Sequence, residues 1–173
     1  MRMLKYHVAS TVDGFIARLD GTFDGFPTEG DHVDDFLASY ASYDAVLMGR
    51  KTYEVGLKAG VTDPYPTMKS YVFSRSMKDS PSPRIEIVSE RACELVKHLK
   101  GEPGKDIWLC GGAELARTLF DDRLIDEIII KLNPILFGAG IPLIAGGVRQ
   151  DALELRHAKV YQSGVVLLTY RVK

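Results

Sequence analysis

The sequence predicts an α/β protein built on a mostly parallel, twisted sheet flanked by helices, with an antiparallel hairpin near its C-terminal end. Three observations predict this class. Strand-like and helix-like segments alternate from residue 4 to about residue 120, an order that calls for right-handed crossovers between parallel strands. One strand ends in Gly111-Gly112 and opens at once into a helix. Two late β-rich segments flank Gln162-Ser163-Gly164, which is a hairpin signal.

Length and composition limit the classes of function. The 173 residues, 46% of them hydrophobic, fit one domain over residues 1–173 with a sizeable core. A net charge of -1 predicts no general attraction to nucleic acid or to an anionic membrane. The two cysteines and four histidines lack metal-ligand spacing, so we expect no metal site. With no apolar leader and no run near the roughly 20 residues of a membrane span, we expect a cytoplasmic protein.

The first predicted strand is Leu4–Val12, which mixes β-forming with small residues and ends at a turn signal, Asp13-Gly14. Phe15-Ile16-Ala17 then re-enters apolar sequence. The long break from Arg18 to Gly30 is rich in glycine and phenylalanine. Two interpretations remain open for this break, an active-site lid and an irregular surface loop.

A helix is predicted to follow, with Asp31 as its candidate N-cap. Apolar residues recur there at helical spacing: Val33, Phe36, Leu37, Tyr40 and Ala41. Asp31, Asp34 and Asp35 crowd the first turn, where the helix dipole favours carboxylates on a solvated face. The alternative is that one of these acids lies at the mouth of a cleft.

Two further strands end in an arginine with a hydroxyl nearby. Asp44–Met48 leads through Gly49-Arg50-Lys51-Thr52 into a helical stretch, and Ser70–Phe73 ends in Ser74-Arg75-Ser76. Guanidinium and hydroxyl groups recognise phosphate monoesters through charge-assisted hydrogen bonds. Either arginine could instead be an ordinary surface residue, but the pairing of the two strand ends favours a phosphate site.

The segment Arg84–Val88 is another predicted strand, and Ser89 is the candidate cap of a helix with apolar residues at helical spacing, Ala92, Leu95, Val96 and Leu99. The strand-glycine-helix unit Lys105–Phe120 comes next, with Leu115, Ala116, Leu119 and Phe120 facing inward. A helix start leaves about four N–H groups unpaired, and glycines let a ligand approach them, so this junction suits pyrophosphate. A plain tight turn is the alternative. Cys110 reads as a buried strand residue rather than a nucleophile.

The last part of the chain changes character. Ile125–Leu132 is a predicted strand, and Asn133–Gly147 is an apolar loop with several glycines and prolines. Leu153–Tyr161 and Val165–Arg171 are the predicted hairpin strands. The apolar residues of Val165–Tyr170 and of the Pro134–Ile144 loop exceed what a small domain needs late in its chain, so we expect a homodimer.

With these motifs in view, the sequence resembles the dihydrofolate reductase-like superfamily, and within it the reductase domain at the C-terminus of bifunctional riboflavin-biosynthesis proteins (RibD). The resemblance covers nearly the whole chain. Its motifs are Val12-Asp13-Gly14-Phe15-Ile16-Ala17, Met48-Gly49-Arg50-Lys51-Thr52-Tyr53, Ser74-Arg75, Gly111-Gly112, and Asp126-Glu127-Ile128-Ile129-Ile130 followed by Pro134, Gly138 and Gly140.

The resemblance implies a three-layer dihydrofolate reductase-like fold, NADPH as cofactor and a homodimer. It implies that Ala9 and Ile16 hold the nicotinamide amide through backbone hydrogen bonds. The residues that it assigns to the adenosine side with its 2′-phosphate are Gly49, Arg50, Thr52, Ser74 and Arg75. Those that it assigns to the pyrophosphate are Gly111, Gly112, Ala113 and Glu114. It also implies that a cis peptide often joins the two glycines.

The resemblance further implies a reductase that passes hydride to a C=N or C=O carbon of a pyrimidine- or pteridine-like substrate, with Asp31 as the first candidate for the acid. Two departures matter. Thr28-Glu29-Gly30-Asp31 is polar where folate reductases place a carboxylate in a drier setting, and no zinc deaminase half is present, so we expect a stand-alone reductase. The alternatives are a dihydrofolate reductase and a dimeric nucleotide-binding module without turnover.

Overall fold

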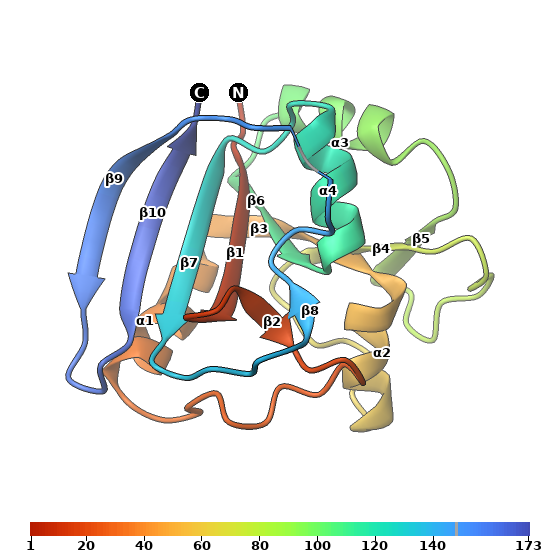
Figure 1. Cartoon of the computed structure of the whole chain (residues 1–173). Helices are drawn as coiled ribbons and strands as arrows, with labels where there is room; N and C mark the ends of the chain where they lie inside the picture. Colours follow the sequence, from red (N-terminus) through yellow and green to blue (C-terminus); the bar gives the residue numbers. More distant parts are fainter. Residues whose placement is uncertain (148) are drawn as a thin grey trace.

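The polypeptide folds around a twisted, mostly parallel sheet with helices on both faces (Figure 1). The computed structural model describes residues 1–147 and 149–173. Over these residues the strands are β1 (Leu4–Thr11), β2 (Phe15–Ala17), β3 (Tyr43–Gly49), β4 (Lys69–Phe73), β5 (Ile85–Val88), β6 (Asp106–Gly111), β7 (Glu127–Asn133), β8 (Ile141–Pro142), β9 (Leu153–Val160) and β10 (Val166–Val172). The helices are α1 (Asp31–Ser39), the 3-10 turn η1 (Tyr40–Ser42), α2 (Arg50–Lys58), α3 (Ala92–Gly101) and α4 (Ala113–Asp121).

The main sheet confirms the predicted class. Its strand order is β5-β4-β3-β6-β1-β7-β10-β9. Neighbours from β5 to β7 run parallel, whereas β10 pairs antiparallel with both β7 and β9. The last two strands therefore form the predicted hairpin, at the edge of the sheet (Figure 1). The short strands β2 and β8 pair with each other outside this sheet.

One face of the sheet packs against α3 and α4. All four inward positions predicted for α4, Leu115, Ala116, Leu119 and Phe120, belong to this core. They pack with side chains of the central strands, among which Leu4 and Tyr6 of β1 are fully buried. An apolar stripe at helical spacing on α4 thus meets alternate residues of the strands, which stabilises both elements.

The opposite face is covered by α1 and α2 around Trp108 of β6. The indole is 2% exposed and lies among the rings of Phe36, Tyr40, Tyr43 and Tyr65, with centroids 4.7–6.1 Å away. Such aromatic pairs contribute about 0.5–1.5 kcal/mol each beyond the area that they bury. This cluster fixes α1 over the sheet, because Phe36 and Tyr40 come from that helix and the turn after it.

In the middle of the sheet, the helices that follow two neighbouring strands pack on opposite faces. The helix after β3, α2, packs through Tyr53 and Leu57 on the Trp108 face, whereas the helix after β6, α4, packs on the opposite face. Because β3 and β6 are neighbours, the chain leaves their adjacent carboxyl ends toward opposite faces of the sheet, which is the topological switch point where open α/β sheets bind ligands.

Two predicted helix starts are wrong. The first helix is capped by Gly30, at φ 115°, and not by Asp31, which is already helical. Asp31 points its carboxylate at the N–H of His32 instead. The third helix begins at Ala92 after Arg91, not at Ser89, because Arg91 itself adopts the left-handed conformation, φ 58°.

The predicted inward face of α1 also needs correction. Leu37 is 53% exposed and Ala41 is exposed, because the helix ends at Ser39 and tightens into η1 before completing the predicted stripe. The buried residue of α1 is His32. The strict alternation of strand and helix also fails twice, since β1 is followed directly by β2 and β4 by β5 without a helix.

Candidate functional site

The carboxyl ends of β3 and β6 bring four predicted residues together. A Cβ added to Gly49 would lie 3.5 Å from the backbone nitrogen of Gly112, and one added to Gly112 would lie 3.3 Å from the hydroxyl oxygen of Thr52. The peptide between Gly111 and Gly112 is cis, as the resemblance implies. The glycines therefore expose backbone at a place where any side chain would fill the space.

Two helices begin at this edge without side-chain caps. Gly49 is the N-cap of α2 and Gly112 is the N-cap of α4, and neither receives a capping hydrogen bond from a side chain. Ala113 and Glu114 form the first turn of α4, so their N–H groups are among those that lack intrahelical acceptors. Two uncapped helix ends that converge beside bare glycine backbone are chemically suited to an anion.

The predicted phosphate arginines differ in availability. Arg50 Nη1 donates to Glu54 Oε1 at 2.6 Å within α2. Arg75 is exposed and follows Ser74, whose hydroxyl accepts from the N–H of Met77 at 2.9 Å and shapes that turn. Arg75 is therefore more available to a phosphate than Arg50, which is paired with Glu54. The Ser74 hydroxyl already accepts a hydrogen bond within its own turn.

The backbone of Ala9 lies at an open edge of β1. The β1–β6 ladder ends at Tyr6, opposite Leu109, whereas β1 stays paired with β7 as far as Thr11. The indole N–H of Trp108, on β6, donates to the backbone carbonyl of His7 at 2.9 Å. Because backbone groups alternate between the two edges of a strand, those of Ala9 face the same side as those of His7, beyond the end of the ladder.

Ile16 lies on β2, next to this open edge. It sits where the β2–β8 register shifts, between Phe15 and Ala17. The turn before it is held by Asp13, whose carboxylate accepts from the N–H of Gly138 at 2.7 Å and of Phe137 at 3.2 Å. The hydrogen bond from Thr11 is the main cause that lowers the pKa of Asp13. Asp13 thereby ties the first turn to the loop after β7.

The long segment after β2 packs on that same loop. The guanidinium of Arg18 lies 4.4 Å from the ring centroid of Phe137, and Phe26 lies 5.4 Å from it. The segment thus borders the loop that Asp13 anchors. Lid and surface loop both stay open as interpretations of its role.

Asp31, the predicted acid, lies at the exposed start of α1. Its side chain is 50% exposed, and its second carboxylate oxygen accepts from the N–H of Gln162 at 3.4 Å, in the β9–β10 turn. The carboxylate therefore links the start of α1 to the hairpin turn by a hydrogen bond. Its role as a proton donor stays a prediction.

A small cavity lies between α1 and the sheet, about 40 Å³ in volume. Its walls come from β1, β7, α1, β10 and the turn after β9: His7, His32, Asp35, Phe36, Ser39, Lys131, Tyr161 and Leu167. Lys131 is the register partner of Ala9 on β1 and of Leu167 on β10. The cavity is therefore one strand away from the open backbone edge.

Burial and hydrogen bonding shift the pKa values of three side chains that line this cavity. Burial, with the nearby ammonium groups of Lys131 and Lys5, lowers the pKa of His7 to about 4, so His7 is neutral at pH 7. Burial also lowers the pKa of Lys131. Hydrogen bonds from Lys159 and Tyr161 lower the pKa of Asp35, which keeps it ionised. The cavity thus combines a neutral imidazole, an ammonium and a carboxylate.

Sequence reasoning missed His7, Lys131 and Asp35 as a group. A signal was present, since His7 and Lys131 are polar residues inside the apolar runs of β1 and β7. Positions of the same parity, such as Glu127, Ile129 and Lys131, share a face of a strand. The register between the two strands was needed to place both side chains under α1.

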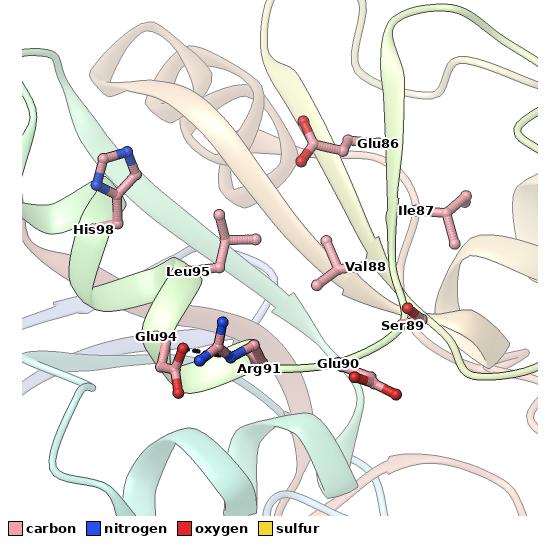
Figure 2. Close-up of a pocket in the computed structure, with 9 residues that line it drawn as sticks. All are labelled: Glu86, Ile87, Val88, Ser89, Glu90, Arg91, Glu94, Leu95 and His98. Atoms are coloured by element: carbon pink, nitrogen blue, oxygen red, sulfur yellow. Dashed lines mark ion pairs between the residues drawn. The ribbon is translucent and has the colours of Figure 1, made fainter.

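A larger, open hollow of about 420 Å³ lies at the β5 edge (Figure 2). Residues of β5 and of α3 line it, with Ser89 and Glu90 between them, and Arg91 pairs with Glu94 at 2.8 Å across its rim (Figure 2). Its carboxylates, Glu86, Glu90 and Glu94, oppose an anionic ligand. None of the predicted site residues lines this hollow.

Among the residues described, no group of three or more His, Cys, Asp and Glu side chains could hold a metal ion. Burial raises the pKa of the Cys110 thiol to about 11, which agrees with its interpretation as a structural strand residue. In the same residues, no helix has the length and apolar character needed to cross a membrane.

The sheet order, the helix placement and the glycine-lined edge define an α/β protein with the dihydrofolate reductase-like fold. The family described as "RibD C-terminal domain" matches residues 2–168. This chain therefore belongs to that family, which is reductase-like.

Relatives and solved structures agree with this assignment. The chain is 34% identical over 165 residues to the uncharacterized protein YwjB of Bacillus subtilis, with 93% of each chain covered, and 31% identical over 181 residues to the uncharacterized protein YyaP of the same organism, with 98% of this chain and 94% of the other covered. A putative riboflavin biosynthesis protein from Shewanella has the same fold, with a TM-score of 0.84 and 24% identity, over 100% of this chain and 99% of that one.

A structure of a two-activity protein is also similar in fold. It is the diaminohydroxyphosphoribosylaminopyrimidine deaminase/5-amino-6-(5-phosphoribosylamino)uracil reductase from Thermotoga maritima, with a TM-score of 0.72 and 16% identity. The match covers 99% of this chain and 57% of the other. This chain thus corresponds in fold to about half of that protein.

Proposed function

We propose that this chain is an NADPH-dependent reductase of a pyrimidine- or pteridine-like substrate, similar to 5-amino-6-(5-phosphoribosylamino)uracil reductase. One observation carries the proposal. The open backbone edge at Ala9 and the glycine-lined junction of Gly49, Gly111 and Gly112 share the carboxyl edge of three neighbouring strands. Membership of the reductase-like family supports it.

The residues present fit a dinucleotide. The space above Gly112 is one that a Cβ would fill, beside the Thr52 hydroxyl, and two uncapped helix ends offer N–H groups to a pyrophosphate. Arg75, exposed at the next strand end, would bind the 2′-phosphate, and Ala9 and Ile16 would hold the carboxamide through their backbones. When bound, the nicotinamide supplies the hydride.

The chain's own residues would orient the reacting groups and exclude water. The cavity under α1 adjoins the β1 edge through Lys131, which is the register partner of Ala9. Its ionised Asp35 is suited to accept a hydrogen bond from a substrate, not to supply a proton, because its pKa is lowered. The proton would come from a bound water or from Asp31.

Steady-state oxidation of NADPH with a panel of heterocycles tests the proposal. Consumption of NADPH with a ribosylamino-pyrimidine would support it, and faster consumption with dihydrofolate would favour a dihydrofolate reductase. A non-catalytic nucleotide-binding module would change nicotinamide fluorescence on binding and would never consume the cofactor. That last result, with all heterocycles, would overturn the proposal.

A further inference from the structure

The parallel ladder between β1 and β6 stops before either strand ends. In the described chain its last pair is Tyr6 with Leu109, whereas β1 continues to Thr11 and β6 to Gly111. Over these last residues β1 stays paired with β7. β6 stays paired with β3, through a register shift that places Met48 opposite Gly111. The two strands therefore lose each other at their carboxyl ends while each keeps its other neighbour.

The parity of the ladder identifies the step that is lost. The N–H of Ile107 donates to the carbonyl of Met3 at 2.8 Å, so every second residue of β6 pairs in turn with β1. The step beyond the last pair would join the Gly111 N–H to the His7 carbonyl, and the Ala9 N–H to the Gly111 carbonyl. Because this step is lost, the backbone of Ala9 keeps a free edge.

The indole of Trp108 occupies the carbonyl that this step would use. Its Nε1 donates to the backbone oxygen of His7 at 2.9 Å, in a buried contact. Trp108 belongs to β6, so the side-chain donor comes from the same strand that would have supplied the Gly111 N–H. Side-chain donors compete with backbone donors for one acceptor, and this competition opposes closure of the ladder as far as Ala9.

Packing holds the indole in this position. Trp108 is 2% exposed, and the rings of Phe36, Tyr40, Tyr43 and Tyr65 surround it with centroids 4.7–6.1 Å away. A buried N–H without a partner is unfavourable, so the indole keeps its hydrogen bond to β1. The direction of this N–H is therefore fixed by the aromatic cluster.

The free backbone groups match a primary carboxamide. Ala9 presents an N–H and a C=O toward the side that β6 has left, as a strand does toward its neighbour. A carboxamide carries a carbonyl oxygen and N–H groups in one plane, as a peptide does. It can therefore take the place of the missing strand, and nicotinamide carries such a group.

We propose that Trp108 is a positioning residue, which separates β1 from β6 through its hydrogen bond to the His7 carbonyl and so keeps the Ala9 backbone free for the carboxamide of the cofactor. Because Trp108 is buried, it acts through the β1 backbone and not by contact with the cofactor. The cofactor part of this inference rests on the proposed function, whereas the separation of the strands does not.

Amide hydrogen exchange of the free protein, followed by NMR, tests the separation. Trp108→Phe keeps a ring in the cluster and removes the donor, so the ladder should extend by one step. The Ala9 amide should then exchange at least about tenfold more slowly than in the wild type. The matched control is Tyr40→Phe, which removes a hydroxyl from the same cluster and leaves the indole in place, and its Ala9 amide should exchange as in the wild type.

Binding of two probes tests the cofactor part. NADPH carries the nicotinamide, whereas adenosine 2′,5′-bisphosphate carries only the adenosine side with its 2′-phosphate. Trp108→Phe should weaken NADPH binding by roughly five- to tenfold, the scale of about one hydrogen bond, and leave the bisphosphate unchanged. A merely structural tryptophan would weaken the binding of both probes equally.

A second replacement covers the case in which Trp108→Phe does not fold. Trp108 is the only tryptophan in the sequence, so a tryptophan auxotroph supplied with benzothienylalanine exchanges the indole N–H for sulfur at this position alone. The same slower exchange of Ala9 and the same selective loss for NADPH are expected.

Unchanged or faster exchange of Ala9 in the folded variants overturns the separation of the strands by Trp108. Equal losses for the two probes, or no loss for NADPH, overturn its positioning role. These outcomes are separable from failure of the proposed function. A wild type that binds neither probe removes the cofactor, while slower exchange of Ala9 in Trp108→Phe still supports the separation.

Discussion

The hydroxyl oxygen of Thr52 on α2 lies 3.3 Å from the place that a Cβ on Gly112 would occupy. We therefore expect Gly112→Val to fold and to lose dinucleotide binding, because the isopropyl group fills the space beside the backbone N–H groups. Each hydrogen bond lost to a charged phosphate should cost about 1.5–3 kcal/mol. Circular dichroism and a cofactor titration measure the two effects.

Gly101→Val is the matched control for this prediction. Gly101 ends α3, and a Cβ there meets nothing within 4 Å, so cofactor affinity should not change. Unchanged affinity in Gly112→Val itself would return Gly111-Gly112 to the status of an ordinary turn.

Arg75 should decide the preference for NADPH over NADH. It is exposed, and no described carboxylate pairs with it, whereas Arg50 is held by Glu54 at 2.6 Å. We expect Arg75→Ala to weaken NADPH binding by about 1.5–3 kcal/mol, roughly ten- to a hundredfold, with little change for NADH. Arg50→Ala should show the same selectivity with a smaller loss.

Dissociation constants for both cofactors in the wild type and in each variant measure this preference. Glu54→Gln is the companion variant, because it releases Arg50 without removing it. An equal loss for NADPH and NADH in both arginine variants would remove the 2′-phosphate assignment.

The strand-glycine-helix junctions could be predicted from the sequence because they depend on local chemistry. Gly111 has φ 138°, a conformation that favours glycine, and the apolar spacing of α4 alone gives its buried face. Both features are set within a few residues of the chain.

The grouping of His7, Lys131 and Asp35 could not be predicted in that way. It depends on the register of β7 against β1 and on the docking of α1, and both are tertiary. The caps failed for a related reason. Asp31 has a good capping side chain, but its carboxylate bonds instead to the N–H groups of His32 and Gln162.

His7 should give the protein a specific loss of stability in acid. Its pKa is about 4 when folded and about 6.5 when unfolded, so between these values the unfolded chain binds the extra proton. The free energy of unfolding should therefore fall as pH drops from about 6.5 to 4, by at most about 1.4 kcal/mol per pH unit. His7→Gln should lack this slope.

Urea unfolding of both proteins across that pH range isolates the effect, since other groups titrate in both. Lys131, Lys5 and the Tyr43 hydroxyl face His7 and stay protonated throughout. Parallel pH profiles for the wild type and His7→Gln would contradict a neutral buried His7.

Self-association should involve the exposed edge strand β9. No helix covers this strand in Figure 1, and it carries Leu155 and Val160, with exposed fractions of 54% and 74%. An unpaired sheet edge with apolar side chains favours association with a second copy. We expect light scattering to give twice the monomer mass, and Leu155→Lys to give a monomer.

Leu136→Lys tests whether the dimer interface is instead the loop after β7, which the sequence analysis favoured together with Val165–Tyr170. Leu136 is 71% exposed, whereas Val165 is fully buried in its own chain. A monomer in Leu136→Lys and a dimer in Leu155→Lys would move the interface to the loop. A wild-type particle of monomer mass at micromolar concentration would exclude the dimer.

The substrate should be a ribosylamino-pyrimidine rather than dihydrofolate. Asp35 lines the cavity and is kept ionised by Lys159 and Tyr161, while Asp31 lies at the helix start. The two side chains are similarly exposed, at 45% and 50%. A carboxylate with a lowered pKa binds an N–H well and is a poor acid, so we expect Asp35→Asn to raise KM for the pyrimidine more than it lowers kcat. Turnover of both substrates at matched NADPH, in the wild type, Asp31→Asn and Asp35→Asn, measures this. If dihydrofolate is the faster substrate and Asp31→Asn abolishes its reduction, Asp31 is the acid and the folate alternative replaces the riboflavin-type function.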